Sequence, residues 1–156
     1  MRLQLAIGTL MLVVGVPAIA TAAPDSNACT LLTRDEAAAA VGGAVGEGKL
    51  TAGGSMSAAG IDVSGCSYAG GSMKELNVSL WRFSPSASQS LEVYRGLCKK
   101  KEQAAGLGDL ACWYNADHKE LQVLKGASLL IFELSGRRGA SDALVTAAKQ
   151  ALGRLK

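Results

Sequence analysis

The sequence predicts an α+β domain in which helices pack on an antiparallel β-sheet and two disulfides join the elements. In some segments apolar and polar residues alternate, as in strands, and in others apolar residues recur at helical spacing. These segments follow one another in the order helix, strands, helix, three strands, helix. Residues 23–156 are long enough to form one domain with a substantial core. Four cysteines follow a predicted export signal, a combination that favours two disulfides over free thiols.

Residues 1–22 have the pattern of a secretory signal peptide. Arg2 supplies the positive start, residues 5–19 form an apolar run, and Ala20 and Ala22 form an A-x-A cleavage pattern. A membrane anchor is the alternative, but the apolar run is short for a span. We therefore expect a periplasmic or secreted protein with no membrane insertion after cleavage.

Charge and motif content argue against several classes of partner. The formal net charge of +3 is close to neutral and gives no reason to expect nucleic acid. The cysteines include no C-x-x-C pair and His118 is the only histidine, so we expect no metal. The glycine-rich residues 42–60 lack the G-K-[ST] ending of a phosphate-binding loop, and we expect no cofactor.

The first element is a short helix with explicit start and stop signals. Thr33 and Glu36 have the T-x-x-E form of a capping box, and four alanines, which are strong helix formers, follow at residues 37–40. Gly42 can end the helix in the left-handed conformation. Residues 42–60 then form either a loop or a poorly defined hairpin.

The next elements are strand-like. The string "CSYAGG" indicates a strand end and a turn. The string "KELNVSLWRF" alternates, with Leu76, Val78 and Leu80 on one side and Trp81 and Phe83 on the other.

A second helix is expected to begin with Ser84 as N-cap and Pro85 at the first helical position. The glycines of residues 106–108 are expected to end it. Its inward stripe repeats at helical spacing and consists of Ala87, Leu91, Tyr94 and Cys98.

Three strands and a final helix complete the order. "LACWYN", "ELQVLK" and "SLLIFEL" read as strands, and the last of them is apolar on both faces, as in a strand covered on both sides. The final helix starts near Ser141, and Arg154 suits the negative end of its dipole. Its predicted buried face consists of Leu144, Ala148, Ala151 and Leu155.

This order bears on the four cysteines. Cys98 lies on the inward stripe of the second helix, and Cys112 shares a strand face with Leu110. A helix packed on that face would bring these two sulfurs together and leave Cys29 for Cys66. Four cysteines allow three pairings, so the connectivity stays open, with this sequential pairing favoured.

The string "GCSYAGG" is close to the nucleophile elbow G-x-S-x-G, with Ala69 in place of the last glycine. Ser67 would be the nucleophile, with His118 as its base and Asp109 as the third member. The chain is too short for the sheet that usually supports such an elbow. A small serine hydrolase centred on Ser67 is therefore kept as the alternative function.

Trp81, Phe83 and Trp113 are the candidate binding residues. If helices cover their strand faces, the three rings belong to the core, which is the simpler arrangement. Rings left exposed would line an apolar groove for a small ligand or a protein partner.

Four strings give the chain a family resemblance: "CTLLTRDEAAAAVG", "GCSY", "GLGDLACW" and "LQVLKG". Through them it resembles an uncharacterised actinobacterial lipoprotein family of small exported proteins, related to LpqN-like proteins. The resemblance implies PsbP-like α/β/α layers around an antiparallel sheet, a bond between Cys29 and Cys66, and no catalytic residues. The chain departs from the family pattern because it lacks a lipobox cysteine and carries Cys98 and Cys112 as an added pair.

We therefore expect an exported, non-enzymatic binding module. Its ligand is an unknown protein or a small apolar molecule, and a narrower version is an immunity or inhibitor-like protein. The prediction depends on the export signal, the two disulfides and the lack of a catalytic constellation.

Overall fold

The computed structural model describes residues 27–56 and 59–155. The predicted signal peptide, residues 1–22, lies outside the described residues. Within those residues, no helix combines the length and the apolar character needed to cross a bilayer.

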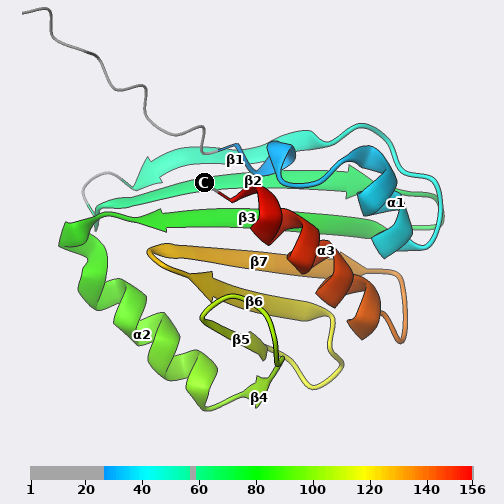
Figure 1. The fold of residues 1–156 in the computed structure, drawn as a ribbon. Helices are drawn as coiled ribbons and strands as arrows, with labels where there is room; N and C mark the ends of the chain where they lie inside the picture. Colours follow the sequence, from blue (N-terminus) through cyan, green and yellow to red (C-terminus); the bar gives the residue numbers. More distant parts are fainter. Residues whose placement is uncertain (1–26, 57–58, 156) are drawn as a thin grey trace, which may run out of the picture.

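The described residues form one antiparallel sheet of seven strands, in the order β1-β2-β3-β7-β6-β5-β4 (Figure 1). Strands β1 to β3 run consecutively. The chain then crosses to the far edge, returns through β4 to β6, and places β7 against β3 in the middle of the sheet. The strands are β1 Lys49–Met56, β2 Ile61–Ala69, β3 Glu75–Phe83, β4 Glu102–Gln103, β5 Leu110–Trp113, β6 Glu120–Lys125 and β7 Ser128–Ser135.

Helices pack on both faces of the sheet. The α-helices are α1 Arg34–Val41, α2 Ser88–Lys99 and α3 Ser141–Arg154, and the short 3-10 helices are η1 Ala28–Thr30 and η3 Pro85–Ala87. Helices α1 and α3 lie side by side on one face, and α2 runs from the end of β3 towards β4 (Figure 1). The predicted α+β class with an antiparallel sheet is confirmed.

Alternation along β3 separates two apolar clusters. Leu76, Val78 and Leu80 are fully buried beneath α1 and α3, in the larger cluster. Phe83, on the opposite side of β3, belongs to a smaller cluster beneath α2 that includes Leu91. Strand β7 contributes to both clusters, as expected of a strand covered on both faces.

Both predicted disulfides are present. Cys29 is bonded to Cys66 and ties η1 to β2, and Cys98 is bonded to Cys112 and ties the end of α2 to β5. The bonds close loops with sequence separations of 37 and 14 residues. In the chain-entropy model each contributes about 3–4 kcal/mol, and the longer loop contributes more. Such bonds are typical of proteins outside the reducing cytoplasm.

Helix α1 begins and ends as predicted. The Glu36 backbone N–H donates to the Thr33 hydroxyl, and the Glu36 carboxylate accepts from the Thr33 backbone N–H at 2.8 Å, which completes the capping box. Gly42 ends the helix with a φ of +75°. A side chain there would be strained and would also meet the guanidinium of Arg137.

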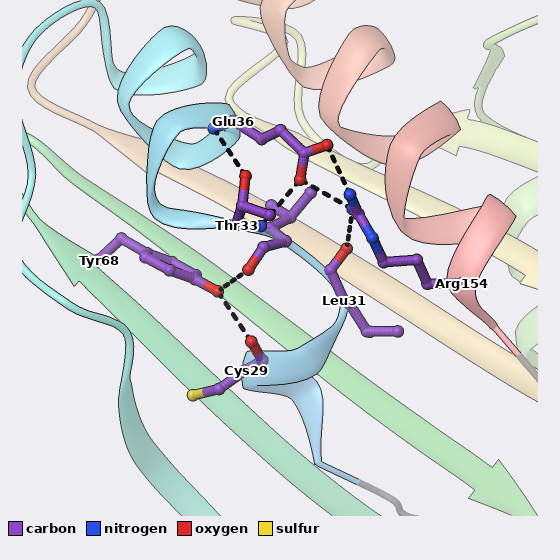
Figure 2. A network of polar contacts seen from close by, with 7 residues as sticks. Cys29, Leu31, Thr33, Glu36, Tyr68 and Arg154 are labelled. Carbon is purple, nitrogen blue, oxygen red and sulfur yellow. Dashed lines mark hydrogen bonds and ion pairs between the residues drawn. The ribbon is translucent and has the colours of Figure 1, made fainter.

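A polar network joins α1, α3 and β2 (Figure 2). Arg154 donates to both oxygens of Glu36 at 2.7 Å and to the backbone carbonyl of Leu31 at 3.0 Å. These hydrogen bonds lower the pKa of Glu36 to about 2. The Tyr68 hydroxyl donates to the carbonyls of Leu32 and Cys29, and burial raises the pKa of Tyr68.

Several predicted boundaries are wrong. Residues 42–60 contain strand β1, which pairs antiparallel with β2 around a bulge near Leu50, as in the predicted hairpin alternative; β2, however, already begins at Ile61. Ser84 does stand at the N-cap position with Pro85 first, but of the short helix η3, which precedes α2; the Ser84 side chain caps nothing and its hydroxyl meets that of Ser86 at 2.7 Å. Helix α2 ends at Lys99, well before residues 106–108, and the Gln103 amide beyond it donates to the carbonyls of Cys98 and Lys101.

Candidate binding groove

Helix α2 covers only part of its sheet face. The end of the face near Phe83 is apolar and lies beneath Leu91 of the helix. The other end is polar: across β2, β3 and β7, Ser67 pairs with Asn77 and Asn77 with Glu133. Because no α-helix in the described chain packs over this polar end, α2 has one flank that faces open sheet.

A groove of about 710 Å³ follows that flank, between α2 and the sheet. This size is typical of small-ligand sites, which occupy roughly 300–1,000 Å³. Neighbouring strands supply the floor and α2 supplies the wall. The main apolar lining consists of Ile61, Trp81 and Ile131 from the strands and Val93, Tyr94 and Leu97 from the helix.

Two aromatic rings form the inner corner of the groove. The half-buried rings of Trp81 and Tyr94 meet edge to face, with centroids 5.7 Å apart. Phe83 supports Tyr94 from behind at 5.8 Å and is itself buried. Such contacts hold the rings in place beyond what burial alone provides.

The mouth of the groove is apolar and exposed. Val93 and Leu97, one turn apart on α2, are 57% and 48% exposed, and Tyr114 is 47% exposed. The Lys101 ammonium lies 4.8 Å from the centroid of the Tyr114 ring, a cation–π contact. Exposed apolar side chains gathered at a cavity mouth are typical of binding sites.

The helical wall is anchored firmly. The Cys98–Cys112 disulfide fixes the last turn of α2 to β5. Arg95, on the flank away from the groove, donates to the backbone carbonyl of Gly126 at 2.9 Å and so holds α2 to the β6–β7 turn. The groove is therefore preformed, and a ligand would not need to order its walls.

The far end of the groove is polar. The Gln122 amide donates to the Glu120 carboxylate at 2.9 Å, and the Gln122 side chain, with only 6% of the residue exposed, faces the groove. Glu120 stands directly opposite Glu133 in the β6–β7 ladder. Among residues 27–56 and 59–155, neither of these carboxylates forms an ion pair.

The three predicted binding aromatics are not brought together. Trp81 lines the groove, Phe83 is buried behind it, and Trp113 lies on the opposite face of the sheet. Trp113 pairs with Leu121 beneath α1 and α3, is 7% exposed, and stacks on His118 at 4.7 Å. Cys112 is turned towards α2, so its neighbour Trp113 must point the other way.

The residues of the predicted elbow also lie apart. The Ser67 hydroxyl donates to the Glu75 carboxylate. His118, in the β5–β6 turn, contacts Glu102 at 2.9 Å, and Asp109 accepts from the backbone N–H of Gly126. Strands β3 and β7 separate β2 from β6, a span of about 14 Å at the usual strand spacing, so Ser67 and His118 do not meet.

Sequence reasoning missed the rim and the polar end of the groove. Val93 and Leu97 carried a signal, because two apolar residues four apart lie outside the inward stripe of α2. Glu120 and Gln122 carried none, since their neighbours depend on strand register. Comparison with protein-family models, curated proteins and solved structures found no match for this chain.

Proposed function

We propose that this protein is an exported, non-enzymatic binding module that takes an apolar group into the groove beneath α2. One observation carries the proposal: a preformed groove of about 710 Å³, with Trp81 and Tyr94 inside and Val93, Leu97 and Tyr114 exposed at its mouth. Apolar side chains gathered at the mouth of a cavity, unlike single exposed ones, are typical of a surface that contacts a ligand.

The two disulfides support a location in the periplasm or outside the cell. The signal peptide of residues 1–22 and a PsbP-like layering related to the actinobacterial lipoproteins remain parts of the same proposal. In the narrower version, an immunity or inhibitor-like protein, an anchoring side chain of the partner would enter the groove. The serine hydrolase alternative has no comparable support, because Ser67 and His118 lie apart.

The test uses the intrinsic fluorescence of Trp81. A Trp113→Phe variant leaves Trp81 as the only tryptophan, and the neutral probe 1-naphthalenemethanol is titrated into it. We expect a saturable change in Trp81 emission. Val93→Asp and Leu97→Asp should each weaken binding about tenfold or more, because each places a charge at the apolar mouth.

The control is Met73→Asp, at a residue that is 93% exposed and lies in the β2–β3 turn. This variant should bind 1-naphthalenemethanol as tightly as the Trp113→Phe protein does. Emission that does not respond to the probe, or equal affinity in the parent and both rim variants, would contradict the proposal. An ester-hydrolysis panel run with Ser67→Ala tests the alternative, and activity lost in that variant would favour the hydrolase.

A further inference from the structure

The groove opens onto an acidic part of the sheet. Glu120 lines the groove from β6, and Glu133 stands opposite it on β7. Glu75 lies on the same face of the next strand, β3, two residues before Asn77, which is the partner of Glu133. Three carboxylates on three adjacent strands therefore adjoin the apolar cavity.

The charges at the groove end are not balanced within the described chain. Like charges directly opposite in a ladder repel one another, with Cβ atoms about 5 Å apart. Within residues 27–56 and 59–155, the Glu120 carboxylate receives one hydrogen bond from Gln122, a neutral donor, and the Glu133 carboxylate receives none. Lys119, the chain neighbour of Glu120, is paired with Asp117 at 2.6 Å, and Lys101 contacts Tyr114 at the groove mouth.

Gln122 adds a third acceptor. Its amide nitrogen donates to Glu120, and within the described residues its side-chain oxygen accepts no hydrogen bond. This oxygen is not among the buried unpartnered atoms of the described chain, and at the groove it can accept a hydrogen bond from a ligand donor. A protonated primary amine has three N–H donors, one each for Glu120, Glu133 and Gln122.

We propose that the ligand is a small cationic amphiphile, with an aromatic or aliphatic body beneath α2 and a protonated amine at the Glu120–Glu133 pair. The inference rests on the proposed function and adds the chemical class of the ligand. The cavity volume suits a single small molecule, the aromatic corner suits its apolar body, and the paired carboxylates suit its charge.

The experiment compares three probes with the same ring: 1-naphthylmethylamine, which is cationic at pH 7, neutral 1-naphthalenemethanol, and anionic 1-naphthoate. Calorimetry measures each affinity for the full chain. We expect the amine to bind about tenfold more tightly than the alcohol, because charge-assisted hydrogen bonds are added, and the carboxylate to bind most weakly. The preference should shrink in high salt, because screening weakens the charge attraction.

Variants then locate the preference. Glu120→Gln and Glu133→Gln should each reduce the amine-to-alcohol affinity ratio several-fold, and the double variant should bring it close to one. Glu47→Gln removes the same charge from a side chain that is 82% exposed and pairs with Arg34, so its ratio should not change. Thermal unfolding adds a second readout: Glu133→Gln should raise Tm slightly, because it relieves repulsion.

The outcomes separate the two proposals. Equal affinities for amine and alcohol in the wild type, or a ratio that survives the double variant, overturn the cationic ligand and leave the binding groove standing. If no probe binds and Trp81 emission does not respond, the binding function itself fails.

Discussion

The ion pair between Glu36 and Arg154 predicts a specific acid sensitivity. Glu36 has its pKa lowered from 4.5 to about 2, chiefly by the hydrogen bonds from Arg154. The unfolded chain therefore binds this proton at a higher pH than the folded protein does. The pair contributes its full stabilisation above about pH 4.5, and that contribution is lost as the pH falls through about 2.

The magnitude follows from the shift and from exposure. One pKa unit corresponds to about 1.4 kcal/mol, so the full shift sets an upper limit of about 3 kcal/mol. The Arg154 side chain is 38% exposed and that of Glu36 is 18% exposed, so solvent screens part of the attraction. We expect about 1–2 kcal/mol of unfolding free energy to depend on this pair.

Urea unfolding at pH 7, 5, 3 and 2 tests this expectation. Wild type should lose about 1–2 kcal/mol more than Glu36→Gln between pH 5 and pH 2, because glutamine keeps an oxygen for the Thr33 cap but carries no charge. Glu47→Gln, in the exposed pair with Arg34 at 3.3 Å, should follow wild type. Equal losses in wild type and Glu36→Gln would refute the reasoning.

Two further predictions concern the disulfides and one turn. Replacing Cys98 and Cys112 with alanine should lower the free energy of unfolding by about 3 kcal/mol and weaken the binding of naphthalene probes, because α2 loses its anchor. Replacing Cys29 and Cys66 should lower the free energy of unfolding at least as much but leave probe affinity in the folded protein unchanged. Equal loss of affinity in both pairs would contradict this. Gly108→Ala should lower the free energy of unfolding in urea by about 3 kcal/mol, because the φ of Gly108 is +55° and a Cβ would lie 2.4 Å from the carbonyl oxygen of Leu124. Gly126→Ala should lower it by only about 1 kcal/mol, because the φ is similar, at +57°, but a Cβ there would meet no other atom within 4 Å. Equal costs would rule out the clash.

Local signals predicted much of the fold. The Thr33–Glu36 capping box, the alternation of Leu76 with Trp81, and the inward position of Cys98 depend only on residues close in the chain. Strand β1 had no such signal, because its glycines and small residues take their conformation from pairing with β2. Strand β4 is two exposed residues long and is formed only by pairing with β5.

The groove was harder to predict because it depends on the register of the strands and on how much of the sheet face α2 covers. Alternation places Trp81 opposite Leu76 but does not say how far α2 reaches across that face. Trp113 lies on the other face because it alternates with Cys112, and register then sets Leu121 and Phe132 beside it. The Glu120–Glu133 pair arises in the same way, since a shift of one residue along β6 would separate the two carboxylates.

The strand order has a consequence for oxidative folding. The Cys29–Cys66 bond lies within the portion of the chain that ends with β3, and the Cys98–Cys112 bond lies within the portion that follows it. Each disulfide can therefore form as soon as its own portion of the chain has collapsed, and the two can form in either order. Neither disulfide links the two portions, so neither fixes how β3 pairs with β7. Pairing of β3 with β7 joins strands 46 to 60 residues apart in the chain, and the disulfides leave it reversible until the correct register is found.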